Sequence, residues 1–255
     1  MKQIDKREIF RNATNILIYI AFTVYGVNTL MKWDQAWLQI LFGAFMLLCL
    51  AIAIFYDVLR YHNRQAIIAM NFDLDMEKFK KHKGFVEKYD FFHSYKLQLL
   101  IQNLHEAQDN QDAQRMQELL EQGEKMLKKN LDTLLVYYYN MFIMNVLLPN
   151  KTQARHFYDK FVDLRGVKVK GHTLSAVYNW DVVEAELHLL NGDGKKARAC
   201  LKNVDLKYMN KRERAYVSYG NYRANKLIGD YAAMKNARNE LENDYPLPGL
   251  LQAIH

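Results

Sequence analysis

Two long stretches without a charged side chain lie close together near the N-terminus, and they constrain this chain more than any other feature. The first runs from Ala13 to Met31 and the second from Ala36 to Tyr56. A helix rises about 1.5 Å per residue, so either stretch is long enough to cross a hydrocarbon layer of roughly 30 Å. Because only Lys32–Gln35 separates them, the sequence predicts a tight transmembrane hairpin within residues 1–62.

Positive charge at the ends of this hairpin predicts its orientation. The turn carries Lys32 alone, whereas the two outer flanks together carry Lys2, Lys6, Arg7, Arg11, Arg60 and Arg64. Lysine and arginine favour the cytoplasmic side of a membrane. We therefore expect a multi-pass protein of the cell membrane (inner or plasma membrane) with both termini in the cytoplasm. A cleaved signal peptide in place of the first span, or a buried hairpin of a soluble protein, are the competing interpretations.

The next segment, residues 63–90, is predicted to be a basic, amphipathic juxtamembrane helix. The start of this segment mixes the apolar residues Ile67, Ile68 and Met70 with Arg64 and other polar residues, as in helices that lie along a membrane surface. Its lysines could bind lipid headgroups. Four acidic residues dilute that charge, so a solvated helix face is the other interpretation; they are Asp73, Asp75, Glu77 and Glu87.

Residues 91–255 are predicted to form pairs of helices. The whole chain has only 3 prolines and 11 glycines, too few for the many tight turns of a β-sandwich or barrel, so the fold class is all-α. The pattern repeats about every 40 residues. The expected first helices are Phe91–Asp109, Leu131–Leu148, Thr173–Leu190 and Lys211–Ile228. Second helices are expected to begin near Asp112, Thr152, Lys195 and Tyr231.

The turns of the last two pairs resemble those of the tetratricopeptide-repeat (TPR) superfamily. Gly192-Asp193 and Gly229-Asp230-Tyr231 match its turn. Early in the second helix, where the family needs close helix approach, the small residues are Ala113, Ala154 and Ala197, whereas the last pair has Met234 there with Ala233 adjacent. The resemblance implies a membrane-anchored, bacterial-type protein with an α-solenoid of about four degenerate TPR-like hairpins after the transmembrane hairpin. A generic helical bundle is the structural alternative.

The sequence contains no complete motif for catalysis or for cofactor binding. The stretch His105–Asp109 begins like a zinc-protease helix but lacks the second histidine that would share the metal. The glycines and lysines at 192–196 lack the remaining residues of a nucleotide-binding loop. Cys49 and Cys200 form no paired or zinc-type spacing. We therefore expect no enzymatic activity, no cofactor and no metal site.

The resemblance to TPR proteins implies a scaffold or adaptor that binds a protein or peptide partner at the cytoplasmic membrane face. Transferring the family's groove positions to the first helices of this chain gives the candidate residues Tyr139, Asn179, Glu186, Tyr216, Tyr219, Arg223 and Lys226. The last four share one stripe of a helix, and tyrosines with Arg and Lys suit an acidic or carboxylate-bearing peptide. Alternatively, the tyrosines are core residues.

Two further functions compete with this one. The hairpin itself could be the active surface, which would make the chain an accessory subunit of a larger membrane complex for transport or export. A basic stretch from Lys195 to Arg214 could bind nucleic acid. Acidic residues interrupt that stretch, and the membrane anchor disfavours it, so we expect membrane lipid and a protein or peptide as the partners.

Overall fold

A computed structural model describes residues 2–169, 172–173 and 178–255 of the chain. Contacts between residues divide it into two compact units, a hairpin unit that ends at Tyr61 and a helical unit from His62 to His255. Its helices are α1 (Lys2–Leu30), α2 (Ala36–Ile68), the π-helix η1 (Ala69–Asp73), α3 (Met76–Tyr89), α4 (Lys96–Asp109), α5 (Ala113–Leu127), α6 (Leu131–Leu147), α7 (Lys151–Asp163), α8 (Trp180–Leu190), α9 (Gly194–Lys202), the 3₁₀-helix η2 (Leu206–Tyr208), α10 (Lys211–Ile228), α11 (Tyr231–Asn243) and α12 (Pro248–Ile254).

The predicted all-α class is confirmed. Among the described residues, extended structure is confined to two strands of two residues, β1 (Lys168–Val169) and β2 (His172–Thr173), which pair antiparallel. The expected helix Thr173–Leu190 was wrong in its start, because Thr173 lies in β2. Its expected residues 174–177 lie outside the described part of the chain. In the structure α8 begins at Trp180, because the side-chain oxygen of Asn179 accepts hydrogen bonds from the backbone N–H groups of Asp181 and Val182 and caps the helix there.

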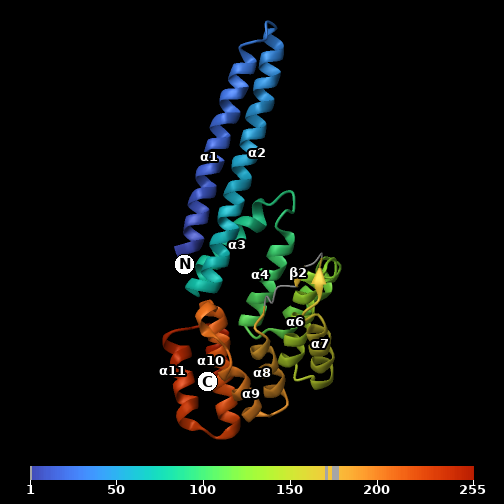
Figure 1. The fold of residues 1–255 in the computed structure, drawn as a ribbon, viewed down its shortest axis with the longest axis vertical. Coiled ribbons are helices and arrows are strands. Elements are labelled where there is room, and N and C mark those ends of the chain that lie inside the picture. The colour runs from blue at the N-terminus through green and yellow to red at the C-terminus, as the bar shows by residue number, and fades with distance from the viewer. Residues whose placement is uncertain (1, 170–171, 174–177) are drawn as a thin grey trace. The chain divides into compact units, whose positions relative to one another are not determined.

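In the hairpin unit, α1 and α2 form an antiparallel pair (Figure 1). Two segments are long and apolar enough to cross a membrane: Ile9–Leu30 in α1, and Ala36–Asp73, which comprises α2 and η1. A polar bridge joins the two helices next to the second uncharged stretch. The carboxylate of Asp57 accepts hydrogen bonds from Asn15 at 2.9 Å and from the hydroxyl of Tyr19 at 2.6 Å. This bridge fixes how the two helices align along their length.

Segment 63–90 packs into the helical unit through both apolar and polar contacts. Ala66, Ala69, Met70 and Phe79 form a buried cluster. The ammonium of Lys83 lies 2.6 Å from the carboxylate of Glu106, so at least this lysine is neutralised within the unit. The expected first helix Phe91–Asp109 was also too long at its start, because α4 begins at Lys96.

Four helix pairs follow within the described residues: α4 with α5, α6 with α7, α8 with α9, and α10 with α11. Each helix from α4 to α11 packs against the next one along the chain, as a helical repeat requires. The first helices also contact one another in series, α4 with α6, α6 with α8, and α8 with α10.

The turns inside the four pairs share one hydrogen-bonding pattern. In each turn an Asp or Asn caps the second helix by accepting from the backbone N–H three residues later, and its own N–H binds the carbonyl five residues earlier. The capping residues are Asp112, Asn150, Asp193 and Asp230. The residue before each cap has a positive φ angle, and it is a glycine, Gly192 or Gly229, in the last two turns.

Small side chains let the helices of a pair approach, although not at every expected position. Ala154 and Ala197 are fully buried, as the TPR resemblance implies. Ala113 is only half-buried, and in the first pair the close approach occurs at Gly123 instead. A Cβ atom at Gly123 would lie 2.3 Å from a methyl carbon of Leu100. The four pairs are therefore alike in their turns but not in their packing details.

We expect Gly192→Ala to destabilise the helical unit by about 1 kcal/mol, because Gly192 has a φ of 81° and an L-residue is strained there. Nothing lies within 4 Å of the added methyl group, so the cost arises from the backbone alone. The matched control is Gly84→Ala inside α3, where space is equally open. It should stabilise the unit by about 0.5–1 kcal/mol.

Urea denaturation of the full chain in detergent, followed by circular dichroism, measures both free energies of unfolding. If both substitutions changed the free energy of unfolding in the same direction, the positive φ angle of Gly192 would not explain the result.

Candidate functional site

A pocket of about 240 Å³, here called the central pocket, lies between the first helices of all four pairs. The residues of its walls belong to α4 and the turn after it, and to α6, α8 and α10. Among the described lining residues, none belongs to the second helix of a pair. They are Gln108, Gln111, Tyr139, Ile143, Val146, Leu147, Val182, Val183, Glu186, Tyr216, Tyr219 and Arg223.

Five of the seven candidate residues line this pocket: Tyr139, Glu186, Tyr216, Tyr219 and Arg223. Two do not. Asn179 caps α8 and lines an adjoining cavity of about 360 Å³, which shares Tyr139 and Tyr216 with the central pocket. Lys226 is exposed near the end of α10, with its ammonium 5.9 Å from the ring centre of Tyr222. That these residues bind a partner stays a prediction.

Most of the apolar wall escaped the sequence-based prediction. Tyr139, Ile143 and Val146 follow one another at intervals of four and three residues on α6, so they share one stripe of the helix. The sequence could have indicated Ile143 and Val146, because they lie on the same face of the predicted helix as Tyr139. The two glutamines, in contrast, lie near the end of α4, and no pattern in the sequence indicated that the first pair reaches this pocket.

A buried ion pair joins the first and the last helix pair beside the pocket. The Nε atom of Arg212, on α10, lies 2.8 and 2.9 Å from the two carboxylate oxygens of Asp109, on α4. The Arg212 and Asp109 side chains are 9% and 3% exposed. The negative charge of Asp109 raises the pKa of Arg212 despite its burial, so the guanidinium stays charged. The segment His105–Asp109, which begins like a zinc-protease helix, therefore ends at a residue that forms a structural ion pair.

Further hydrogen bonds extend this pair into a network. The hydroxyl of Tyr216 donates to Asp109 at 2.8 Å, and Arg212 donates to the side-chain oxygen of Gln108 at 3.1 Å. Gln108 in turn donates to the hydroxyl of Tyr139 at 3.3 Å. Side chains from α4, α6 and α10 are thus connected. An unpaired charge here would be costly, and the network satisfies both charges.

Close packing at the start of α12 adds a further contact with the end of α4. Gly249 lies so near the end of α4 that a Cβ atom there would be 2.1 Å from the carbonyl oxygen of Asp109. Leu247, Leu250 and Ile254 are buried with residues of α10 and α11. The first and last helix pairs are therefore in contact, and the first helices of all four pairs line one small pocket.

A second ion pair lies in the wall of the central pocket. Arg223 is 2.6 Å from Glu186 of α8, and its guanidinium lies over the ring of Tyr219, 5.3 Å from the ring centre. The Glu186 side chain is 11% exposed. Since each of these charges has its partner in the wall, this pair gives the pocket no net charge.

Tyr139 is held by aromatic contacts as well as by Gln108. Its ring stacks on Tyr178 with centres 3.6 Å apart and planes at 11°. Burial raises the pKa of Tyr139 to about 12. The neutral phenol is therefore favoured by folding, and its contribution to stability is present at neutral pH and is lost as pH rises from the ordinary tyrosine range through 12.

Comparisons of this chain with protein-family models, with curated proteins and with solved structures returned no match. Its function therefore has to be argued from the pocket and the units described above.

We expect Tyr216→Phe to destabilise the helical unit by about 1.5–3 kcal/mol, because it removes a buried hydrogen bond to a charged carboxylate. The matched control is Tyr208→Phe, since Tyr208 is 81% exposed. It should change the free energy of unfolding by less than about 0.5 kcal/mol. Urea denaturation measures both values. Equal effects of the two substitutions would mean that the Tyr216 hydroxyl does not support the ion pair.

Proposed function

We propose that this chain is a membrane-anchored scaffold without enzymatic activity, and that its helical unit binds a protein or peptide partner at the cytoplasmic face of the membrane. The observation that carries the proposal is the central pocket, to which the first helices of all four pairs contribute. In TPR-like repeats the partner's groove is formed by the same helices. The recurring turns and the packing of neighbouring helices support this assignment to a TPR-like α-solenoid.

The size of the pocket favours a partner that inserts one or two side chains. Its volume of about 240 Å³ lies below the range of roughly 300–1,000 Å³ that small-molecule and cofactor sites usually have. Aromatic side chains around an apolar floor are typical of the centre of protein interfaces, where a few anchors supply most of the binding energy. Here Tyr139, Tyr216 and Tyr219 are those aromatic residues.

The anchor that this pocket fits best is apolar or aromatic. Ile143, Val146 and Val183 contribute apolar surface, whereas the side-chain amide of Gln108 already bonds to Arg212 and Tyr139. Arg223 is already paired with Glu186, so the described wall offers an acidic side chain little free positive charge. We therefore propose an apolar anchor in place of the acidic peptide that the tyrosine and arginine stripe suggested.

The hairpin unit is the proposed anchor. Two helices of sufficient length and apolarity support insertion in the cell membrane, and many of their large apolar side chains are exposed. The excess of Lys and Arg at the outer flanks supports an orientation with both termini in the cytoplasm. The helical unit would then find its partner at the inner surface.

We expect a photoreactive p-azidophenylalanine at Tyr219 to cross-link to one partner of discrete mass when the full chain is expressed in its own cells. Tyr219 lines the central pocket, whereas Tyr231, the matched control, is 74% exposed on the second helix of the same pair. The same substitution at Tyr231 should give no discrete product. The readout is the cross-linked band and its identification by mass spectrometry.

Partner recovery from Tyr231 but not from Tyr219 would contradict binding in the pocket, provided that both variants keep the melting temperature of the parent. A third variant with the photoreactive group at Phe45, an exposed residue of α2, tests the accessory-subunit alternative. Cross-linking at Phe45 alone would support that alternative and overturn the scaffold.

A further inference from the structure

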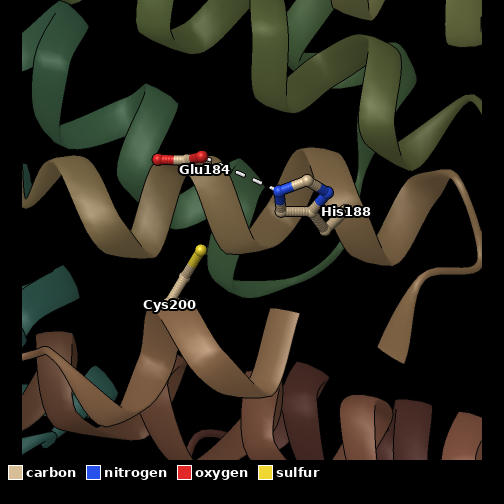
Figure 2. Close-up of side chains that lie close together, drawn as sticks. All are labelled: Glu184, His188 and Cys200. Atoms are coloured by element: carbon tan, nitrogen blue, oxygen red, sulfur yellow. Dashed lines mark ion pairs between the residues drawn. The ribbon is translucent and has the colours of Figure 1, made fainter. Parts of the chain in front are cut away.

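Three side chains with metal-binding atoms converge on the third helix pair, away from the central pocket. They are Glu184 and His188 on α8 and Cys200 on α9, and their donor atoms all lie within 4.8 Å of one another. Figure 2 shows the sulfur of Cys200 directed from α9 toward the two side chains of α8. The Nε2 atom of His188 is 3.7 Å from a carboxylate oxygen of Glu184.

The packing of the pair brings these groups together. Glu184 and His188 are four residues apart, so they lie on one face of α8, one turn from each other. Ala185 of α8 and Ala197 of α9 belong to the same buried cluster, and their small side chains allow the helices to approach. Cys200 follows Ala197 by three residues, which places its thiol on the side of α9 that faces α8.

The chemistry of the three donors selects a class of ion. Thiolate sulfur, imidazole nitrogen and carboxylate oxygen together suit Zn²⁺ and similar transition metals, whereas Ca²⁺ and Mg²⁺ prefer oxygen ligands alone. With bond lengths of about 2.0–2.3 Å, tetrahedral ligands lie roughly 3.3–3.8 Å apart. The Glu184–His188 pair already has this separation. Cys200 needs only a small adjustment, because none of the other ligand separations exceeds 4.8 Å.

The surroundings favour a cation and allow the side chains to adjust. Asp181 lies three residues before Glu184 on α8, so a second carboxylate lies on the same face of the helix. The Glu184 side chain is 48% exposed, and His188 and Cys200 are partly exposed. An ion therefore has access from solvent. The simpler interpretation is a surface ion pair between Glu184 and His188, which would leave Cys200 without a role.

We propose that Glu184, His188 and Cys200 bind one Zn²⁺ or a similar divalent transition metal, which clamps α8 to α9. Three protein ligands leave the fourth coordination position for water or for a group from outside the chain. The site shares no residue with the central pocket, so a negative result for the metal leaves the proposed scaffold function unaffected. It would hold the third pair together without a bound partner.

Titration of the metal-free full chain in detergent with Co²⁺ tests the site, because thiolate binding to Co²⁺ produces a charge-transfer absorption band. We expect one Co²⁺ per chain, displaced by Zn²⁺, and a rise in melting temperature with Zn²⁺. Cys200→Ser should abolish the band, and His188→Gln or Glu184→Gln should weaken binding by about tenfold or more. The matched controls are Cys49→Ser and His156→Gln, which should leave the titration unchanged.

Absence of the band at stoichiometric Co²⁺ would overturn the proposal. Persistence of the band in Cys200→Ser, or its loss in Cys49→Ser, would overturn it as well, because the ion would then bind elsewhere. Each variant is compared with the parent by circular dichroism. If Cys200→Ser loses its helical signal, Glu184→Gln decides the question, since its exposed side chain can be replaced without disturbing the core, and unchanged Co²⁺ affinity there contradicts the site.

Discussion

The ion pair between Arg212 and Asp109 is the interaction on which the shape of the helical unit depends. It joins side chains 103 positions apart in the sequence, and both are almost fully buried. Burial of two charges is costly unless each has its partner and further hydrogen bonds, which Tyr216 and Gln108 supply here. The pair therefore stabilises one arrangement of the helices, in which the last pair returns to the first.

That arrangement turns a repeat array into a pocket. The four turns repeat one hydrogen-bonding pattern, so each helix pair resembles the next, and the first helices face a common centre. An open array would leave these helices along an extended groove. Because the first and last pairs are in contact, the same residues line a volume of about 240 Å³. In the wall of this pocket, Glu186 and Arg223 form an ion pair, so neither charge is left unpaired.

Local features of the structure could be predicted from the sequence, whereas distant contacts could not. The two apolar stretches and the starts of the second helices near Asp112 and Tyr231 follow from short-range patterns. Five of the seven candidates transferred from the TPR resemblance line the central pocket. The partnership of Arg212 with Asp109 leaves no such pattern, since neither neighbourhood differs from an ordinary solvated helix. The same holds for Cys200, which lies on a different helix from Glu184 and His188. The error at α8 arose because the cap at Asn179 was taken for a position inside the helix.

A double-mutant cycle on Asp109 and Arg212 tests the central claim most directly. The free energy of unfolding is measured by urea denaturation for the parent chain, Asp109→Asn, Arg212→Met and the double variant. Each single substitution should cost about 3–5 kcal/mol, and the double variant should lose clearly less than the sum, because no charge then remains buried without a partner. Single effects that add within about 0.5 kcal/mol would contradict a coupled pair and, with it, the closed arrangement of the four helix pairs.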